Sequence, residues 1–198
     1  MKIVLATGNQ GKVAEMQHSL QEFGFEVVPQ SEFNIPEAIE DGLTFVENAL
    51  KKARHACELT GLAAIADDSG LEVDALNGEP GIYSSRYAED DNGKPSGSQA
   101  NNEKLLNALS GVENRAARFQ CVIVYLKHAN DPTPIIASGT WEGQIASKAT
   151  GNNGFGYDPL FYVQSEGLHA AELSPQKKEQ LSHRGKALTA LKIALQGS

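Results

Sequence analysis

The segment that most constrains the fold lies at the start of the chain, where an apolar run meets a glycine-containing turn and then a helical pattern. Lys2–Ala6 has the composition of a buried strand. A strand that turns directly into a helix points backbone N–H groups and the positive end of the helix dipole at one spot, and glycine lets a ligand approach closely. The turn Thr7–Lys12 therefore predicts a phosphate site, with a positive charge from Lys12. Apolar residues recur at helical spacing after it, at Val13, Met16, Leu20 and Phe23.

The alternative for this turn is an ordinary connection between a strand and a helix. Its sequence, Thr7-Gly8-Asn9-Gln10-Gly11-Lys12, matches neither G-x-x-x-x-G-K-S/T nor G-x-G-x-x-G. Taken alone, the segment leaves both interpretations open.

Length and composition limit the class of protein. With 198 residues, the chain fits one medium domain or two closely joined lobes, and residues 1–198 are treated as a single domain. A net charge of −8 argues against nucleic-acid and membrane partners, which need a basic face. The apolar start is too short for a signal-peptide core and no run reaches transmembrane length, so we expect a cytoplasmic protein. Cys57 and Cys121 fall in apolar patterns and predict buried side chains rather than a disulfide or metal pair.

The pattern along the chain predicts an α/β fold with a mixed sheet flanked by helices. A long acidic connection at 29–43 precedes a capping box, Thr44 to Glu47, and a helix that continues to Leu59. Glu47 is therefore interpreted as a cap rather than a catalyst. Strands are predicted at 117–126 and 135–146 in an antiparallel meander, and helices at 99–109, from Ser174-Pro175, and from Ser182.

Two carboxylates follow a buried strand at 63–66. We expect this strand to end in Asp67-Asp68-Ser69-Gly70 and a second strand to occupy 71–74. Ligands of open α/β sheets bind beyond the carboxyl ends of strands, where the turn after Ala6 also lies. If the chain stays extended, Asp67 and Asp68 point to opposite faces, so one of them faces the ligand.

Glu40, in the acidic connection, is a candidate to join that aspartate in holding Mg²⁺, which prefers a few carboxylates with water and phosphate oxygens. A solvated acidic loop is the alternative, and the spacing alone favours it.

Basic and aromatic groups near the C-terminus are further candidates. Ser182 as a helix cap would place His183 and Arg184 beside a helix N-terminus, in a geometry suited to an anion or a carbonyl oxygen. Phe155 could stack on a base and Asp158 could accept a hydrogen bond from a ring N–H. A capped helix with exposed first-turn residues and aromatic side chains that fill the core are the alternatives.

Six blocks occur in order along nearly the whole chain: Thr7-Gly8-Asn9-x-x-Lys12, Glu40-x-Gly42-x-Thr44-Phe45-x-Glu47-Asn48-Ala49, Ala66-Asp67-Asp68-Ser69-Gly70, Pro80-Gly81-Ile82-Tyr83-Ser84, Gly154-Phe155-Gly156-Tyr157-Asp158-Pro159 and Leu181-Ser182-His183-Arg184. Together they resemble the inosine/xanthosine triphosphate pyrophosphatase family, and most of all its bacterial dITP/XTP branch. The resemblance implies an elongated mixed sheet in two lobes with the active-site cleft between them, and a homodimer. It also implies Mg²⁺-dependent hydrolysis of ITP, dITP and XTP to the monophosphate and pyrophosphate, which clears deaminated purines from the nucleotide pool.

Residue by residue, the resemblance implies that Glu40 and Asp68 hold Mg²⁺ and that Asp68 is the proton acceptor. Because a metal-bound aspartate is a poor base, orientation of the water by Asp68 stays open as its main role. Lys178 is preferred to Lys177 because it keeps the spacing to the Ser182-His183-Arg184 block. The implied substrate contacts come from Thr7, Gly8, Asn9, Gln10, Gly11, Lys12, Lys52, Ser69 and Lys178, and the implied base contacts from Phe155, Gly156, Tyr157, Asp158, His183 and Arg184.

Two rival functions remain at this stage. One is a related pyrophosphatase whose preferred base is a modified pyrimidine. The other is a sensor that binds ITP without cleaving it, and the presence of both Glu40 and Asp68 argues against it.

Overall fold

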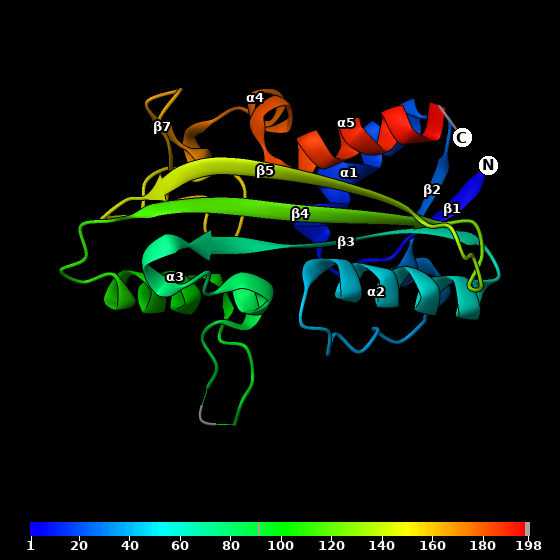
Figure 1. Cartoon of the computed structure of the whole chain (residues 1–198), viewed down its shortest axis with the longest axis horizontal. Helices are drawn as coiled ribbons and strands as arrows, with labels where there is room; N and C mark the ends of the chain where they lie inside the picture. The colour runs from blue at the N-terminus through cyan, green and yellow to red at the C-terminus, as the bar shows by residue number, and fades with distance from the viewer. Residues whose placement is uncertain (91, 197–198) are drawn as a thin grey trace. The chain divides into compact units, whose positions relative to one another are not determined.

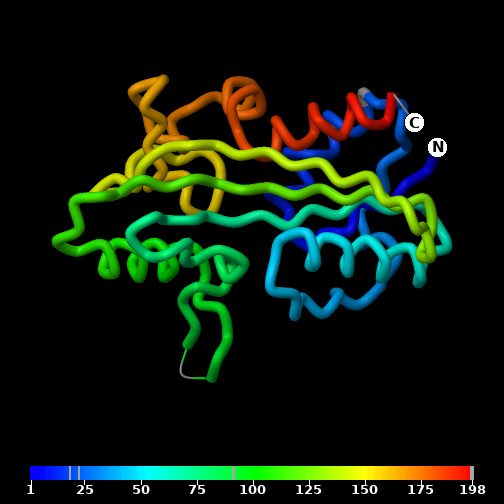
Figure 2. Tube along the Cα trace, viewed as in Figure 1, coloured from blue at the N-terminus to red at the C-terminus, as the bar shows by residue number. Residues whose placement is uncertain are grey.

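The chain forms two compact units. The computed structural model describes residues 1–90 and 92–196, apart from the side chains of residues 18 and 22. Unit 1 comprises 1–68, 121–139 and 183–198, and unit 2 comprises 69–120 and 140–182. Three of the boundaries between the units fall within β3, β4 and β5, and the fourth falls between α4 and α5. Figure 2 traces the chain by residue number. The treatment of 1–198 as one domain, and the cleft between lobes, stay predictions.

In the described part of the chain, seven strands form one sheet in the order β2-β1-β3-β4-β5-β6-β7. β2 and β3 pair with β1 in parallel, whereas β6 pairs with β5 and β7 in antiparallel fashion. The sheet is therefore mixed, and the helices beside it confirm the predicted α/β class (Figure 1). The strands are β1 (Lys2–Leu5), β2 (Glu26–Pro29), β3 (Ala63–Val73), β4 (Ala116–Leu126), β5 (Ile135–Ile145), β6 (Phe161–Val163) and β7 (Leu168–His169).

Side chains cap the starts of the first two helices, and the cap at Thr44 was predicted. Asn9 caps the first helix and Thr44 the second, and in both the side-chain oxygen accepts from the third residue after it, Lys12 and Glu47. The α-helices are α1 (Gln10–Glu22), α2 (Phe45–Thr60), α3 (Gly97–Ala108), α4 (Pro175–Leu181) and α5 (His183–Gln196). Single 3₁₀ turns occur at η1 (Gln30–Phe33), η2 (Asp74–Leu76), η3 (Gly81–Arg86) and η4 (Ala170–Glu172).

Unit 1 has an apolar core on each face of its strands. In Figure 1, α1 and α5 lie on one face and α2 on the other. Because successive side chains of a strand point to opposite faces, each strand feeds both cores alternately. Thus Ala63 and Ile65 of β3 join the core under α1 and α5, whereas Ala64 and Ala66 join the core under α2.

Unit 2 is built around a cluster of aromatic and aliphatic side chains. The ring of Phe161, which is fully buried, lies 4.6 Å from that of Phe119 and 5.1 Å from that of Trp141, between centroids. Leu71 and Val73, at the end of β3, belong to this core, as does Leu105 of α3.

One predicted boundary is wrong. Asp67 and Asp68 do not end a strand, because β3 continues without a break from Ala63 to Val73. The sequence Asp-Asp-Ser-Gly suggested a turn, but Leu71 and Val73 bury themselves in unit 2 and keep the chain extended. The strand that ends beside these aspartates is β1. Its last residue, Leu5, pairs with Ile65, and the N–H of Ala6 donates to the carbonyl oxygen of Ile65 at 2.8 Å. The two aspartates therefore lie just beyond the carboxyl end of β1.

Within the described residues, no helix combines the length and the apolar character needed to cross a bilayer. Cys57 and Cys121 are buried free thiols, as predicted.

Candidate active site

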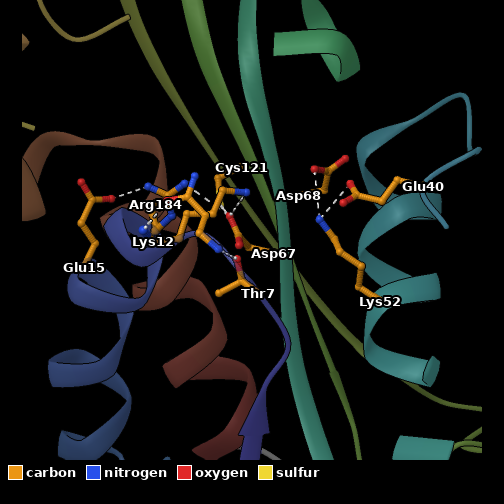
Figure 3. Close-up of polar contacts among 10 residues, drawn as sticks. Thr7, Lys12, Glu15, Glu40, Lys52, Asp67, Asp68, Cys121 and Arg184 are labelled. Atoms are coloured by element: carbon orange, nitrogen blue, oxygen red, sulfur yellow. Dashed lines mark hydrogen bonds and ion pairs between the residues drawn. The ribbon is translucent and has the colours of Figure 1, made fainter. Parts of the chain in front are cut away.

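The side chains of Asp67 and Asp68 point to opposite faces of β3, as Figure 3 shows. Asp67 has the same parity along the strand as Ile65, and so it points toward α1 and α5. Asp68 has the parity of Ala66 and points toward α2. The alternation predicted from sequence is thus confirmed, and it divides the charged groups of unit 1 into two clusters.

The first cluster is centred on Asp67, whose side chain is 0% exposed. Its Oδ2 accepts from Nζ of Lys12 at 3.1 Å and from an N–H of Arg184 at 3.3 Å. Burial raises the pKa of this aspartate, but the positive charges of Lys12, Arg184 and Lys52 outweigh it and hold the pKa well below its usual range. Asp67 is therefore a charged internal counter-ion, and its lowered pKa makes it a poor acceptor for a proton from water.

Arg184 is held by a second carboxylate in the same cluster. Its guanidinium donates to Glu15, three residues after Lys12 on α1. The Arg184 side chain is 3% exposed and that of Glu15 is 27% exposed. Burial lowers the pKa of Arg184, but the surrounding negative charge of Asp67 and Glu15 raises it overall, so that the guanidinium stays cationic.

The second cluster is centred on Lys52 of α2. Its Nζ donates to Oε2 of Glu40 at 3.1 Å and to Oδ1 of Asp68 at 3.3 Å. Burial favours the neutral amine, but Asp68, Asp67 and Glu40 outweigh burial and raise the pKa of Lys52. The two carboxylates that sequence analysis assigned to a metal thus meet at one cation.

Asp68 differs electrostatically from its neighbour. Burial is the strongest influence on its pKa, and with the negative charges of Glu40 and Asp67 it raises that pKa in spite of Lys52 and Lys12. Its Oδ2 is buried and has no hydrogen-bond partner among the described residues. Asp68 is therefore a more basic carboxylate than usual, and none of the described residues donates a hydrogen bond to its second oxygen.

The turn after β1 has the geometry of an anion site. Thr7 is buried and its Oγ1 accepts from the N–H of Asn9 at 3.2 Å, and Asn9 then caps α1. Gln10 and Gly11 are the first residues of that helix. At Gly8 a Cβ would lie 2.3 Å from Oε1 of Glu37, so the acidic connection approaches the turn closely. Sequence analysis placed the turn correctly at a helix N-terminus.

The loop that carries Glu40 is fixed to the start of α2. The N–H of Gly42 donates to Oδ1 of the buried Asn48 at 2.8 Å, and the N–H of Leu43 donates to Oε2 of Glu47 at 2.8 Å. Glu47 also accepts from the hydroxyl of Thr44 at 2.9 Å, which confirms it as a cap. The hydrogen bonds of Asn48 and Glu47 thus hold the loop immediately after Glu40.

In unit 2, a tight loop turns around Asp158. Its Oδ2 accepts from the N–H of Phe155 at 2.8 Å and from Nζ of Lys178 at 2.7 Å. The same ammonium lies 5.0 Å from the centroid of the Phe155 ring. A Cβ at Gly154, where φ is +74°, would lie 2.1 Å from Asp158 Oδ2, so only glycine fits there. This loop brings Phe155 and Asp158 together with Lys178 of α4.

Other predicted site residues have different surroundings. Tyr157 is 4% exposed and its hydroxyl donates to the carbonyl of Ser84 at 2.8 Å, so its ring is part of the core. Gly156 accepts at its carbonyl from the side chain of Asn102 at 3.1 Å. Ser69 is half-buried on β3, and His183 is buried as the first residue of α5.

Sequence analysis missed two residues of this site. Glu15 resembled any charged residue on the outer face of α1, although its spacing of three from Lys12 places both on one side of the helix. Asp67 was recognised only as the neighbour of Asp68. The number of cations that surround it could have been foreseen only from the fold.

The donor set of the second cluster fits Mg²⁺. Glu40 and Asp68 offer hard carboxylate oxygens, and both approach the same point, which the ammonium of Lys52 marks. The described residues include no group of three or more His, Cys, Asp or Glu side chains arranged to hold a metal. Mg²⁺ needs only one or two carboxylates when phosphate and water supply the remaining oxygens. The arrangement thus suits a metal that arrives with a phosphorylated ligand.

Taken together, unit 1 contains a helix N-terminus with Lys12, a second half-buried lysine, Lys52, and a basic carboxylate beside a candidate Mg²⁺ position. Such groups can neutralise a polyphosphate and orient a water toward phosphorus. The site can therefore support hydrolysis of a phosphoanhydride.

Comparisons with known proteins agree with this chemistry. The model of the Ham1 family matches residues 3–194. A Vibrio vulnificus protein named dITP/XTP pyrophosphatase is 62% identical over 192 residues, which cover 96% of this chain and 94% of the relative. A protein of the same name from Thioalkalivibrio sulfidiphilus is 59% identical and both chains are covered in full. The solved structure of a HAM1 protein from Coxiella burnetii has a TM-score of 0.90 at 48% identity, and both chains are covered in full. These findings confirm the resemblance seen in the sequence.

Proposed function

Because this chain belongs to the Ham1 family, we propose that it hydrolyses ITP, dITP and XTP to the nucleoside monophosphate and pyrophosphate. Removal of these deaminated nucleotides keeps them out of DNA and RNA. The names of relatives up to 62% identical over nearly the whole chain support the substrate class. The observation that carries the chemistry is the convergence of Glu40, Lys52 and Asp68 beside the end of β1.

The triphosphate is proposed to bind at the N-terminus of α1. Thr7, Gly8 and Asn9 shape the turn, and the N–H groups of Gln10, Gly11 and Lys12 begin the helix. Lys12 can contact phosphate while it stays paired with Asp67, because an ammonium has three N–H donors. Lys52 adds a second positive charge, and Ser69 follows Asp68 on the same strand.

Mg²⁺ is proposed to bind Glu40 and Asp68, where it would neutralise phosphate charge and polarise the bond to be broken. Oδ2 of Asp68 is the atom that would orient the attacking water and accept its proton. No described residue donates a hydrogen bond to this oxygen, and the raised pKa of the carboxyl likewise supports that role. Lys52 would keep the two carboxylates close together.

Base recognition is proposed for the loop Phe155, Gly156, Tyr157 and Asp158 and for His183 and Arg184, and Lys178 is proposed as a further substrate contact. Hydrogen-bond donors that face the 6-oxo group of hypoxanthine or xanthine would be left unpaired by the 6-amino group of ATP, which can cost about four to five powers of ten in selectivity. The buried ring of Tyr157 and its bond to Ser84 indicate that this residue shapes the loop rather than contacts the base. The rigid contacts of Asp158 support a loop of fixed conformation.

The homodimer and the cytoplasmic location are further parts of this proposal. They are supported by the sequence resemblance.

The deciding experiment measures pyrophosphate and monophosphate released from ITP, XTP, GTP and ATP, with Mg²⁺ and with a chelator. We expect pyrophosphate release from ITP and XTP that stops when the metal is removed, because Glu40 and Asp68 are themselves negative and would repel the triphosphate without a divalent cation between them. Faster cleavage of a modified pyrimidine triphosphate would favour the first rival. Tight binding of ITP without cleavage would favour a sensor and contradict the proposal.

Substitution of Gly42 by alanine should weaken the response to metal. A Cβ at this position would lie 2.7 Å from both Asn48 Oδ1 and Glu47 Cβ, so the loop must move and take Glu40 with it. We expect the Mg²⁺ concentration for half-maximal activity to rise several-fold, measured by metal titration at saturating ITP. Leu43→Ala is the control because Leu43 is 82% exposed. Equal metal titrations for the two variants would argue against this role of the loop.

Lys12→Ala should weaken triphosphate binding for every base alike, because Lys12 contributes charge rather than recognition. KM for ITP, XTP and ATP is expected to rise by a similar factor, measured from initial rates. A rise confined to one base would assign Lys12 to base recognition instead.

A further inference from the structure

The side chain of Arg184 is enclosed by carboxylates that come from two different elements. Glu15 lies on α1 and Asp67 on β3, whereas Arg184 belongs to the first turn of α5. Figure 3 shows the guanidinium between the two acids. All three elements belong to unit 1.

The exposure of Arg184 shows how the guanidinium is used. Its side chain is 3% exposed and donates to Glu15 and to Asp67, in the latter case at 3.3 Å. A guanidinium is planar, so two carboxylates at different edges fix its orientation as well as its position. The side chain therefore ties the first turn of α5 to α1 and to β3.

Stability alone is a poor reason for such an arrangement. Buried ion pairs lose much of their attraction to the cost of desolvation, and apolar residues of the same volume often stabilise a protein as well or better. An arrangement of this kind is more useful where functional groups must be held within about half an ångström of a productive position. His183 and Arg184, the residues of this turn, are those proposed to recognise the base.

We propose that Glu15 and Asp67 are positioning residues for base selectivity, which act by fixing Arg184 and the first turn of α5. This inference rests on the proposed function, and it names residues that set the preference for a 6-oxo purine without touching the base.

Asp67 also connects Arg184 to the turn that is proposed to bind phosphate. The same oxygen, Oδ2, accepts from Arg184 and from Lys12, at 3.3 and 3.1 Å. Asp67 thus positions both Lys12, which is proposed to bind the phosphates, and Arg184, which is proposed to recognise the base. Asp67→Asn should consequently disturb both, whereas Glu15→Gln should disturb Arg184 and leave Lys12 paired.

The test is the ratio of kcat/KM for ITP to kcat/KM for ATP, measured by pyrophosphate release. A misplacement of about 1 Å can cost up to about a hundredfold in rate, and we expect Glu15→Gln to narrow the ratio roughly tenfold. Arg184→Lys keeps the charge but loses the planar fork, and it should narrow the ratio as well. Because both changes break the same contact, the double variant should be no less selective than Arg184→Lys alone.

The controls separate positioning from folding. Glu26→Gln removes the same charge at an exposed position of β2 and should keep the wild-type ratio. A merely structural role for Glu15 would lower kcat/KM for ITP and ATP by the same factor, and that result would overturn the inference. Multiplicative effects of Glu15→Gln and Arg184→Lys would overturn it too.

Two further outcomes stay distinguishable. If Asp67→Asn does not fold, Glu15→Gln still decides, because the Glu15 side chain is 27% exposed and tolerates a change of charge. If wild-type protein releases no pyrophosphate from ITP, the proposed function fails. If the wild type prefers ITP and Glu15→Gln keeps that preference, the inference alone fails.

Discussion

Asp68→Asn is expected to abolish pyrophosphate release from ITP and leave the protein folded. Asparagine has nearly the shape of aspartate but cannot accept the proton of an attacking water and is a weak ligand for Mg²⁺. We expect kcat to fall by at least about a thousandfold, by analogy with losses of single groups in other active sites. Rates are measured at saturating Mg²⁺, and Asp74→Asn, which removes an exposed carboxylate paired with Arg118, serves as control. A rate near that of the wild type would remove Asp68 from the reaction.

The same substitution should not lower the free energy of unfolding at neutral pH. Burial and neighbouring negative charge raise the pKa of Asp68 in the folded protein, so the folded state binds this proton more tightly than the unfolded state does. This group therefore costs stability above its folded pKa, and the cost disappears as pH falls below the unfolded pKa. Thermal unfolding at neutral and at acid pH checks the sign: the advantage of the Asn variant should be present at neutral pH and vanish in acid. A variant that is less stable at neutral pH would contradict this explanation.

Lys52→Met is expected to separate metal binding from turnover. The ammonium lies 3.1 Å from Glu40 and 3.3 Å from Asp68, so it both holds the two carboxylates and competes with a divalent cation for them. Without its charge, the carboxylates should bind Mg²⁺ more tightly, whereas loss of a cation that stabilises phosphate should lower kcat by about a hundredfold or more. The measurement is a Mg²⁺ titration of initial rates at saturating ITP.

The matched control for this variant is Lys51→Met. Lys51 precedes Lys52 on α2, its side chain is 44% exposed, and it pairs with Asp41. Its loss should change neither the metal titration nor kcat by more than a small factor, since exposed ion pairs contribute little. If Lys52→Met needed more Mg²⁺ than the wild type, the competition between ammonium and metal would be ruled out.

Local sequence signals predicted much of the fold. The capping box from Thr44 to Glu47 marks the start of α2 because the threonine hydroxyl can satisfy an N–H of the first helical turn. The alternation of Asp67 and Asp68 followed from the period of an extended chain. These features arise from residues that are close together in the sequence, and they can therefore be predicted from it.

Contacts between distant segments were beyond such reasoning. Glu15 and Arg184 are 169 residues apart, and no periodicity indicates that α1 and α5 cover the same face of the sheet. The continuation of β3 past Gly70 depends on Leu71 and Val73, which are buried only because unit 2 provides a second core. Recognition of Lys12 as a candidate needed the turn alone, whereas recognition of its partner Asp67 needed the fold.

The early end of β1 has a consequence for how this chain can change in length. β1 pairs with β3 only as far as Leu5 and Ile65, and the few residues that follow span the distance to α1 before Lys12 meets Asp67. A single inserted residue between Ala6 and Gln10 would preserve every pair of β1, and where the first turn of α1 takes up the extra residue, each residue of shift turns a side chain by about 100° around the helix. Lys12 would then face away from its carboxylate. A substitution between Ala6 and Gln10 therefore affects only the contacts of the residue that is changed. An insertion or deletion there affects the placement of every residue in the first turn of α1.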